Sequence, residues 1–130
     1  MVGAAAVTPP ARRSIGPRGL RHVALRSRDL RATERFYVDV LGLRVAFPHR
    51  VMLFLESPGG GDLLNFVATR RAFDAAAGGL DHLGLRVPPA GWRGALARLR
   101  RAGVRIEGRR GRDAVYFRDP NGYTVELYRD

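Results

Sequence analysis

Two histidines and one glutamate stand out because their side chains suit a metal ion although they lie far apart in the chain. His22 and His82 each lie within a short segment of alternating apolar residues, and Glu126 lies in the last such segment, between Val125 and Leu127. Two neutral imidazoles and one carboxylate are a known ligand set for divalent metals, and with open positions they form the non-haem iron facial triad. The pattern therefore predicts a site with these three residues as metal ligands.

The same residues also have structural interpretations. A histidine in a strand is more often a core residue that bonds a backbone carbonyl, and Glu126 could be a surface carboxylate or the ion-pair partner of a protonated histidine. A carboxylate in an apolar strand is costly to bury unless something pairs with it. The combined pattern of two equivalent histidines and one such carboxylate favours the metal interpretation.

The histidines are equivalent because the sequence repeats itself. Residues 20–26 read LRHVALR and residues 80–86 read LDHLGLR, while residues 42–45 (GLRV) return as 103–106 (GVRI). A fixed offset predicts two copies of one unit, each about 50 residues long. In both copies the residue two places beyond the histidine is small, Ala24 or Gly84, which predicts open space beside each imidazole.

Each copy is expected to fold as β-α-β-β-β, which gives an α+β fold class. Apolar alternation predicts strands, three- and four-residue spacing predicts one amphipathic helix per copy, and Gly42 and Gly103 are expected to end these helices. We expect a disordered tail at 1–18 and one domain at 19–130, divided into module one at 19–69, a linker at 70–79 and module two at 80–130. The expected strands are 20–26, 45–47, 51–55 and 63–68, then 80–87, 104–107, 114–117 and 123–128; the expected helices are 30–41 and 91–102.

Composition limits the function classes. The chain has 130 residues, no Cys and a formal charge of +11, with all of its basic residues being Arg. A chain without Cys has no disulfide scaffold or thiolate metal site and agrees with a cytoplasmic location. No apolar run reaches the length that crosses a membrane. A large net charge on a protein more often keeps it soluble than binds it to a polyanion, so a nucleic-acid partner is not expected for this chain.

Many arginines fall close together in the last part of the second expected helix and after it. They could clamp a carboxylate or phosphate substrate, or contact nucleic-acid phosphates. The expected arrangement is simpler: a solvated face and end of the helix, followed by an Arg-rich turn. The residues concerned are Arg98, Arg100, Arg101, Arg105, Arg109, Arg110 and Arg112.

Several further motifs accompany the candidate ligands. They are Leu20-Arg21-His22-Val23, Asp29-Leu30 with Glu34-Arg35-Phe36-Tyr37, Val40-Leu41-Gly42, Leu80-Asp81-His82, and Tyr116-Phe117-Arg118-Asp119-Pro120-Asn121-Gly122 with Glu126. Over residues 19–130 the chain thereby resembles the vicinal oxygen chelate superfamily, which includes glyoxalase I, extradiol dioxygenases, fosfomycin-resistance thiol transferases and bleomycin-binding proteins. The resemblance implies two paired βαβββ modules that form a curved mixed sheet around a metal-lined cleft, with His22, His82 and Glu126 as ligands.

The resemblance also assigns roles around the metal. Glyoxalase I enzymes add an acidic or amide ligand on the fourth strand of the first module, where the repeat places Asn65, or Leu64 if the register shifts by one. Asn65 is a weak ligand and cannot act as a base, so proton abstraction of the glyoxalase I kind is less favoured. Asn65 is expected to contact substrate, and its alternative is a polar strand residue without such a role. Tyr116 matches a tyrosine near the metal in the extradiol and fosfomycin groups and is the catalytic candidate; a core aromatic is its alternative. Tyr128, on the same strand face as Glu126, is a substrate-binding candidate.

These expectations combine into two functions. The first is a divalent-metal-dependent enzyme that acts on a small oxygen-rich substrate, with extradiol dioxygenase-like or glyoxalase/isomerase-like chemistry and Fe2+, Mn2+, Ni2+ or Zn2+ as its cofactor. The second is a metal-free binder of a small molecule or drug, similar to the bleomycin-resistance proteins. In both cases a homodimer is expected, because open sheet edges need cover.

Overall fold

The computed structural model describes residues 14–130. Residues 1–13, which form most of the tail expected to be disordered, lie outside the described residues. Residues 14–18 are exposed and belong to no helix or strand. Among the described residues, no helix has the length and apolar character needed to cross a membrane.

The first module folds as the sequence predicts. The Asp29 side chain accepts a hydrogen bond from the Ala32 amide at 3.0 Å and so caps the helix, and Gly42 follows it with a φ of 85°. The helix widens partway into a π-helical segment, η3, which continues α1 without a break. The elements are β1 (His22–Ser27), α1 (Leu30–Glu34), η3 (Arg35–Val40), β2 (Arg44–Phe47), β3 (Met52–Glu56) and β4 (Leu63–Ala68).

The second module repeats this order with one correction. The strand expected at 104–107 is wrong: the strand lies at Gly108–Arg110, inside the segment expected to be an Arg-rich turn. Its hairpin partner β7 fixes this position, because Gly108 pairs with Tyr116 and Arg110 with Ala114. The elements are β5 (Leu83–Val87), η5 (Pro89–Gly91), α2 (Trp92–Arg101), β6 (Gly108–Arg110), β7 (Ala114–Arg118) and β8 (Thr124–Arg129), and η4 (Ala75–Ala77) lies between the modules.

Each module forms a four-stranded mixed sheet, with the orders β1-β4-β3-β2 and β5-β8-β7-β6. In both sheets the first strand runs parallel to the fourth and lies at the edge. The expected α+β fold of two βαβββ modules is therefore confirmed. The pairing Ala24–Asn65 matches the pairing Gly84–Glu126, so Asn65, and not Leu64, is the structural counterpart of Glu126.

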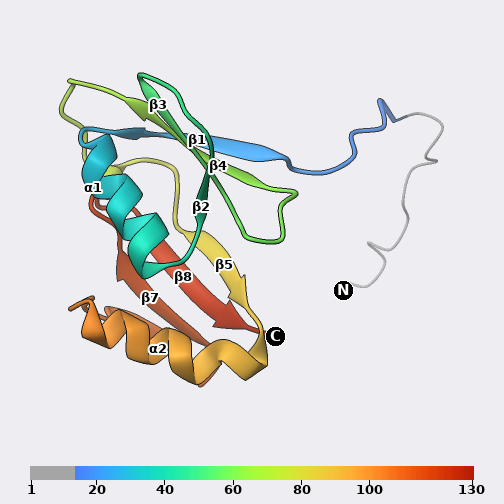
Figure 1. Ribbon diagram of the computed structural model, residues 1–130, viewed down its shortest axis with the longest axis vertical. Helices are drawn as coiled ribbons and strands as arrows, with labels where there is room; N and C mark the ends of the chain where they lie inside the picture. Colours follow the sequence, from blue (N-terminus) through green and yellow to red (C-terminus); the bar gives the residue numbers. More distant parts are fainter. Residues whose placement is uncertain (1–13) are drawn as a thin grey trace, which may run out of the picture.

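The modules pack together through η3 and the inner faces of both sheets. Figure 1 shows α1 and η3 between the two sheets and α2 along the second sheet. The Tyr37 ring lies 5.2 Å from Phe66 of the first sheet, and the Phe36 ring lies 6.1 Å from Phe117 of the second. Tyr37, Phe66 and Phe117 are fully buried. These aromatic contacts form one hydrophobic core that both modules share.

A buried hydrogen-bond network joins the same two modules. The Tyr37 hydroxyl donates to Oδ2 of Asp119 at 2.8 Å, and Oδ1 of Asp119 accepts from the amides of Asn121 and Tyr123 at 2.8 and 2.9 Å. The Asn121 side chain also donates to Thr33 at 3.1 Å. Burial raises the pKa of Asp119 above its ordinary value, although its hydrogen bonds oppose this. The turn at 119–122 therefore reverses the chain and also links the second module to the first through hydrogen bonds.

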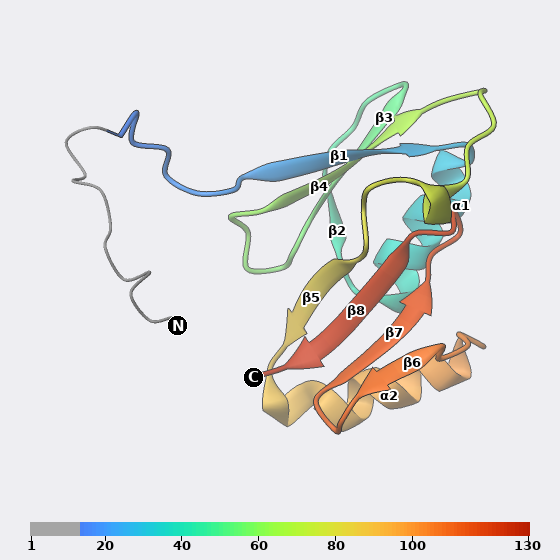
Figure 2. The same ribbon diagram turned by 180° about the vertical axis from the view of Figure 1, so that it is seen from behind.

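The outer faces of both sheets carry the candidate residues. Side chains alternate along a strand, and Leu83, Leu85, Val125 and Leu127 belong to the core or pack against it, so His82, Gly84 and Glu126 point the other way. Figure 2 shows the second sheet from that side, where no helix of the described chain covers it. The same alternation places His22, Ala24 and Asn65 on the outer face of the first sheet, opposite the buried Phe66.

Candidate functional site

Two of the three candidate ligands meet on the outer face of the second sheet. His82 lies immediately before β5, and Glu126 lies on β8 directly opposite Gly84 and Tyr116. The Nε2 atom of His82 is 3.1 Å from Oε1 of Glu126. Glu126 is 7% exposed, so its carboxylate is held at a buried position on the central strand pair rather than in open solvent.

The other ring nitrogen of His82 has its own carboxylate partner. Nδ1 of His82 lies 2.6 Å from Oδ2 of Asp81, a side chain that is itself exposed. The Tyr116 ring lies edge-on to the imidazole, with centroids 5.7 Å apart and planes at 89°. The imidazole is therefore oriented from both sides, and its Nε2 is directed at Glu126.

Arg110 is the residue that sequence reasoning missed. Its Nη2 donates to Oε2 of Glu126 at 2.7 Å, reaching over β7 from the edge strand β6. Ala114, opposite Arg110 in the register, has only a methyl group, which leaves room for the long side chain to pass. The sequence does not show that Arg110 lies near Glu126, because this depends on the register of the hairpin formed by β6 and β7.

The surroundings of Glu126 favour its charged form. Burial by itself would raise the pKa of this carboxyl group, but the hydrogen bond and charge of Arg110, with smaller contributions from Tyr116 and His82, hold the pKa below its ordinary value. The carboxylate is thus anionic near neutral pH, which both an ion pair and a metal ligand require.

The space expected beside His82 is partly filled. A methyl group added at Gly84 would lie 3.4 Å from the Tyr128 ring and 3.8 Å from Oε1 of Glu126. Gly84 therefore allows Tyr128 and Glu126 to approach β5 closely. The small residue at this position was expected to leave open space beside His82, but these two side chains occupy part of that space. Tyr128 is half-buried, and its ring and Oε1 of Glu126 both lie next to Gly84.

The first sheet presents a different set of residues. His22 is exposed at the start of β1, and Asn65 is 4% exposed on the central strand β4. Oδ1 of Asn65 is buried without a hydrogen-bond partner among the described residues. The neighbouring Phe54 lies 4.4 Å from the Phe47 ring, and Phe47 is 47% exposed. This outer face therefore carries an apolar patch at Phe47 and Phe54, next to the buried Oδ1 of Asn65.

Replacing Asn65 with leucine is expected to stabilise the fold by about 1–2 kcal/mol. Leucine has nearly the same shape and removes a buried carbonyl that has no partner, the costly kind of polar group. Urea denaturation of the two proteins measures the difference in the free energy of unfolding. A less stable variant would show that Asn65 makes a stabilising interaction in the folded protein.

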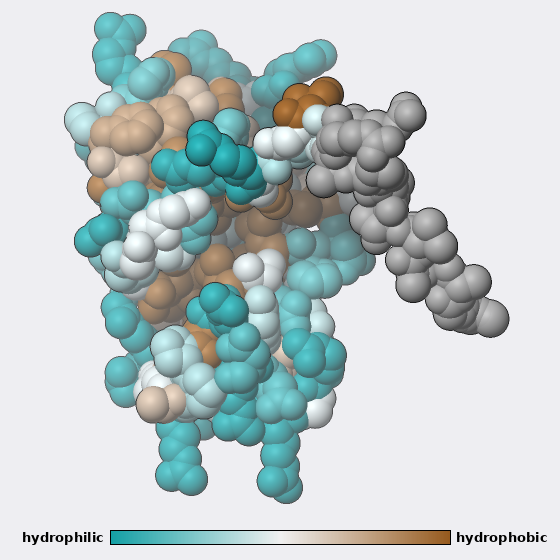
Figure 3. Space-filling view, turned by 90° about the vertical axis from the view of Figure 1, so that its right-hand side faces the viewer, coloured by the Kyte–Doolittle hydropathy of each residue, from teal (hydrophilic) through white to brown (hydrophobic). Residues whose placement is uncertain are grey.

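A cavity of about 410 Å3 opens between the modules, next to both histidines. His22 and His82 line it together with Gly84 and a majority of apolar side chains. Figure 3 shows hydrophobic surface in the hollow between the two halves of the molecule. The apolar residues that line it are Leu20, Val23, Leu43, Leu55, Leu63, Leu64, Leu80, Leu83 and Leu85.

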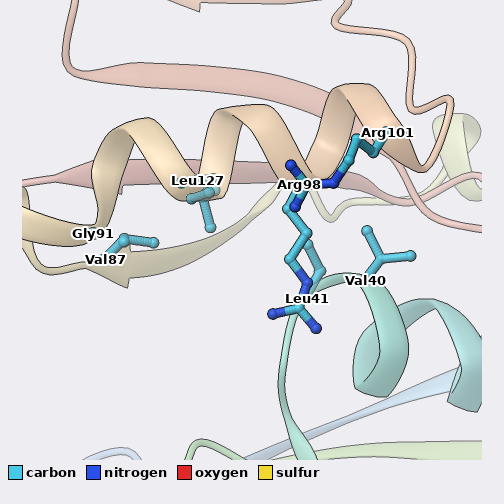
Figure 4. A pocket seen from close by; sticks show the side chains of 9 residues that line it. Val40, Leu41, Val87, Gly91, Arg98, Arg101 and Leu127 are labelled. Carbon is cyan, nitrogen blue, oxygen red and sulfur yellow. The ribbon is translucent and has the colours of Figure 1, made fainter.

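A second hollow, of about 440 Å3, lies on the helical side of the molecule. Figure 4 shows Arg98 extending from α2 toward Leu41, and its guanidinium donates to the backbone oxygen of Asp39 at 2.8 Å. Apart from Arg98 and Arg101, the lining is apolar or glycine. The hydrogen bond of Arg98 thus connects α2 to the end of η3. The hollow lies between these elements, and its lining among the described residues contains no His, Asp or Glu side chain that could act as an acid or base.

The three candidate ligands do not form one group within the chain. Across residues 14–130, no cluster of three or more His, Cys, Asp or Glu side chains is arranged to hold a metal ion. His82 and Glu126 are in contact, whereas His22 belongs to the other sheet. A single chain thus provides two potential ligand atoms close together, Nε2 of His82 and Oε1 of Glu126. They lie on the face of the second sheet that no helix of the described chain covers.

Comparison with known proteins gives the same architecture. The model of the family described as "Glyoxalase/Bleomycin resistance protein/Dioxygenase superfamily" matches residues 19–127. No curated protein matches the chain significantly in sequence.

Among solved structures, the chain is similar to a lactoylglutathione lyase from Agrobacterium tumefaciens, with 26% identity, a TM-score of 0.67, and coverage of 87% of this chain and 94% of that one. A glyoxalase/dioxygenase from Nostoc punctiforme has 22% identity and a TM-score of 0.72, covering 87% of this chain and 91% of that one. The antibiotic-binding protein TnmS3 from Streptomyces sp. CB03234 has 19% identity and a TM-score of 0.73, covering 89% and 98%. The last two likenesses concern the fold alone.

Proposed function

Because the chain belongs to the glyoxalase/bleomycin resistance/dioxygenase superfamily, which contains both enzymes and binding proteins, we propose that it is a divalent-metal-dependent enzyme acting on a small oxygen-rich substrate. The observation that carries this proposal is the contact of 3.1 Å between Nε2 of His82 and Oε1 of Glu126. Both atoms are ligating atoms, and both lie on an uncovered sheet face.

The geometry of this pair fits a metal ion. Two ligands that lie about 2.1 Å from one cation and at right angles to each other are about 3 Å apart. The contact between Asp81 and Nδ1 of His82 is the outer-sphere arrangement that orients a metal-binding imidazole and leaves Nε2 free to coordinate. Arg110 bonds the other oxygen of Glu126, so it leaves Oε1 available.

We further propose that the third ligand is His22 of a second copy of the chain. His22 is exposed, its strand β1 forms a sheet edge, and Phe47 and Val51 of the same module are exposed hydrophobic residues. A homodimer that joined the outer face of one first sheet to the outer face of one second sheet would cover these exposed residues. It would place His22 and Asn65 in the same cleft as His82 and Glu126.

Each remaining residue has a role in such a cleft. The metal would supply Lewis-acid activation of adjacent substrate oxygens. Tyr116, edge-on to His82 and opposite Glu126, would donate its hydroxyl proton in a hydrogen bond to substrate, and Tyr128 would pack against the substrate beside Gly84. The unpaired Oδ1 of Asn65 would accept a hydrogen bond from a substrate hydroxyl. As a neutral amide, Asn65 cannot remove a proton, so we favour chemistry of the extradiol type over that of glyoxalase I.

Metal titration combined with variant mixing tests this proposal. Purified protein is expected to bind Mn2+, Fe2+, Ni2+ or Zn2+ at one ion per chain, while His22→Ala and Glu126→Gln each lose this ion. If the two variants are unfolded together and refolded, half of the dimers are mixed, and each mixed dimer has one intact site, so about a quarter of the binding is expected to return. Recovery of none would place all three ligands within one chain, and absence of metal from the wild type would overturn the metal site. Anaerobic assays with Fe2+ and catechols, and then with a glutathione hemithioacetal, identify the reaction.

The metal-free binder is the second candidate, and the Arg110 contact favours it. Glu126 already has two partners, Arg110 and His82, so its charge is compensated without a cation. One structural neighbour, TnmS3, is an antibiotic-binding protein. If metals leave the thermal stability unchanged while an aromatic drug raises it, this function replaces the first.

A further inference from the structure

The helical side of the second sheet carries a hollow of about 440 Å3 that the proposed function does not use. It lies between α2 and the end of η3, and Val87 and Leu127 of the second sheet contribute to its apolar lining. Leu127 belongs to the core and follows Glu126 on β8, and side chains alternate along a strand. The hollow therefore lies on the opposite face of this sheet from Glu126. Its volume is within the range of small-molecule pockets, about 300–1,000 Å3.

One stripe of α2 borders the hollow, and its residue types change along the helix. Gly91, Gly94 and Ala95, at or near the start of the helix, have little or no side chain. Arg98 and Arg101 follow in the last turn. Figure 4 shows Gly91 toward one end of the helix and the two arginines toward the other. One end of the groove is thus open and apolar, and guanidinium groups border the other end.

The charge of this groove is positive and is not compensated within the described chain. No Asp or Glu side chain of residues 14–130 lines it, and neither Arg98 nor Arg101 is in any salt bridge among these residues. Arg98 does bond Asp39, but through the backbone oxygen, so that contact brings no carboxylate. It also uses only one of the five N–H groups of a guanidinium. The other N–H groups are available to a ligand.

We propose that this hollow is a second ligand site, which takes an amphiphilic carboxylate: a molecule with one carboxylate and an apolar body, such as a medium-chain fatty acid. The carboxylate accepts hydrogen bonds from Arg98 and Arg101, since a guanidinium matches the two oxygens of this group. The apolar body lies along α2 beside Gly94 and covers Val87 and Leu127. Both guanidinium groups are exposed, so solvent and salt screen part of their charge, and one carboxylate suffices. This inference does not depend on the metal site.

Calorimetric titration of the full-length protein tests the role of the charge, with octanoate as the probe and 1-octanol as its uncharged counterpart. Octanoate is expected to bind at one molecule per chain, and octanol about 10-fold more weakly, the size of one charge-assisted hydrogen bond. Arg101→Gln is expected to weaken octanoate about 10-fold and octanol less than about 2-fold. The matched control Arg100→Gln removes the same charge from a residue that borders a different hollow. It is expected to leave both affinities within about 2-fold.

A second variant, Gly94→Leu, tests the hollow itself. A Cβ atom at this position would have no atom within 4 Å, and leucine favours a helix more than glycine does, so the variant is expected to fold. Because its side chain would occupy the groove, octanoate and octanol are both expected to bind about 10-fold more weakly or less. Gly94→Ala adds only a methyl group and is the control. Thermal unfolding of each variant confirms that it is folded.

Amide chemical shifts locate the ligand. In the proton–nitrogen correlation spectrum, octanoate is expected to shift Gly91 and Gly94, and not Gly84, which borders the cavity between the modules. Shifts at Gly84 alone, no binding of octanoate, or an affinity that Arg101→Gln leaves unchanged would each overturn the proposal. So would equal losses in Arg100→Gln and Arg101→Gln. Shifts of Gly91 and Gly94 that depend on protein concentration without ligand would show that a second copy covers the hollow, which also overturns it.

Discussion

Glu126→Gln is expected to weaken metal binding at least about 100-fold, the upper end of what the loss of an outer-sphere partner costs. Glutamine keeps the length of the side chain but removes the negative charge that a divalent cation requires. It also replaces one of the two carboxylate oxygens, which Arg110 and His82 contact separately, by an NH2 group that cannot accept, at a position that is 7% exposed. Equilibrium dialysis with Mn2+ or Zn2+ gives the two dissociation constants.

The chain provides a matched control in Glu107→Gln. Glu107 also pairs with an arginine, Arg118, at 3.1 Å, but it is exposed and has no histidine against it. This variant is expected to bind metal as the wild type does. Equal metal affinity in the wild type and Glu126→Gln would mean that Glu126 is not a metal ligand and serves only as the ion-pair partner of His82 and Arg110.

Asp119→Ala is expected to reduce the free energy of unfolding by about 3–5 kcal/mol. The substitution leaves the Tyr37 hydroxyl and the amides of Asn121 and Tyr123 without their acceptor in a buried position, and each unsatisfied group costs about 1–3 kcal/mol. Since a domain of this size has about 5–15 kcal/mol in total, the variant approaches the limit of folding. Urea denaturation at neutral pH measures the loss.

Asp113→Ala serves as the comparison for this loss. Asp113 pairs with Arg129 at 3.1 Å, but its side chain is 58% exposed, so the change is expected to cost less than about 1 kcal/mol. Similar losses in the two variants would show that the network around Asp119 does not hold the modules together. If Asp119→Ala fails to fold, Tyr37→Phe removes one donor from the network, and its expected cost is about 1 kcal/mol.

The sign of the pH effect at Asp119 follows from its raised pKa. Because its folded-state pKa lies above the unfolded value, the protonated form is favoured by folding. The associated stability is fully present below the unfolded pKa and is lost as the pH rises through the folded pKa. The charged form of Asp119 thus carries a cost of burial that its four hydrogen-bond donors reduce but do not remove.

Much of the fold could be predicted from local pattern and the internal repeat. Alternation around His22 and His82 identified the first strands, Gly42 marked the end of the first helix, and the repeat gave two βαβββ units, all of which the structure contains. The repeat also placed Asn65 opposite Glu126 in the modules, and the strand register confirms this equivalence. These features depend on short-range periodicity and turn chemistry, which a sequence displays directly.

Other features depended on strand register and on how the modules pack. Arg110 was expected in a solvated turn, but the pairing of β6 with β7 carries its side chain over Ala114 to Glu126. The meeting of His82 and Glu126 follows from the parallel pairing of β5 with β8, whereas His22 starts a strand of the other sheet. Residue types and their spacing thus indicated which side chains could do chemistry. Which of them meet in one chain was decided by long-range packing, because no local sequence preference fixes the angle between two independently formed sheets.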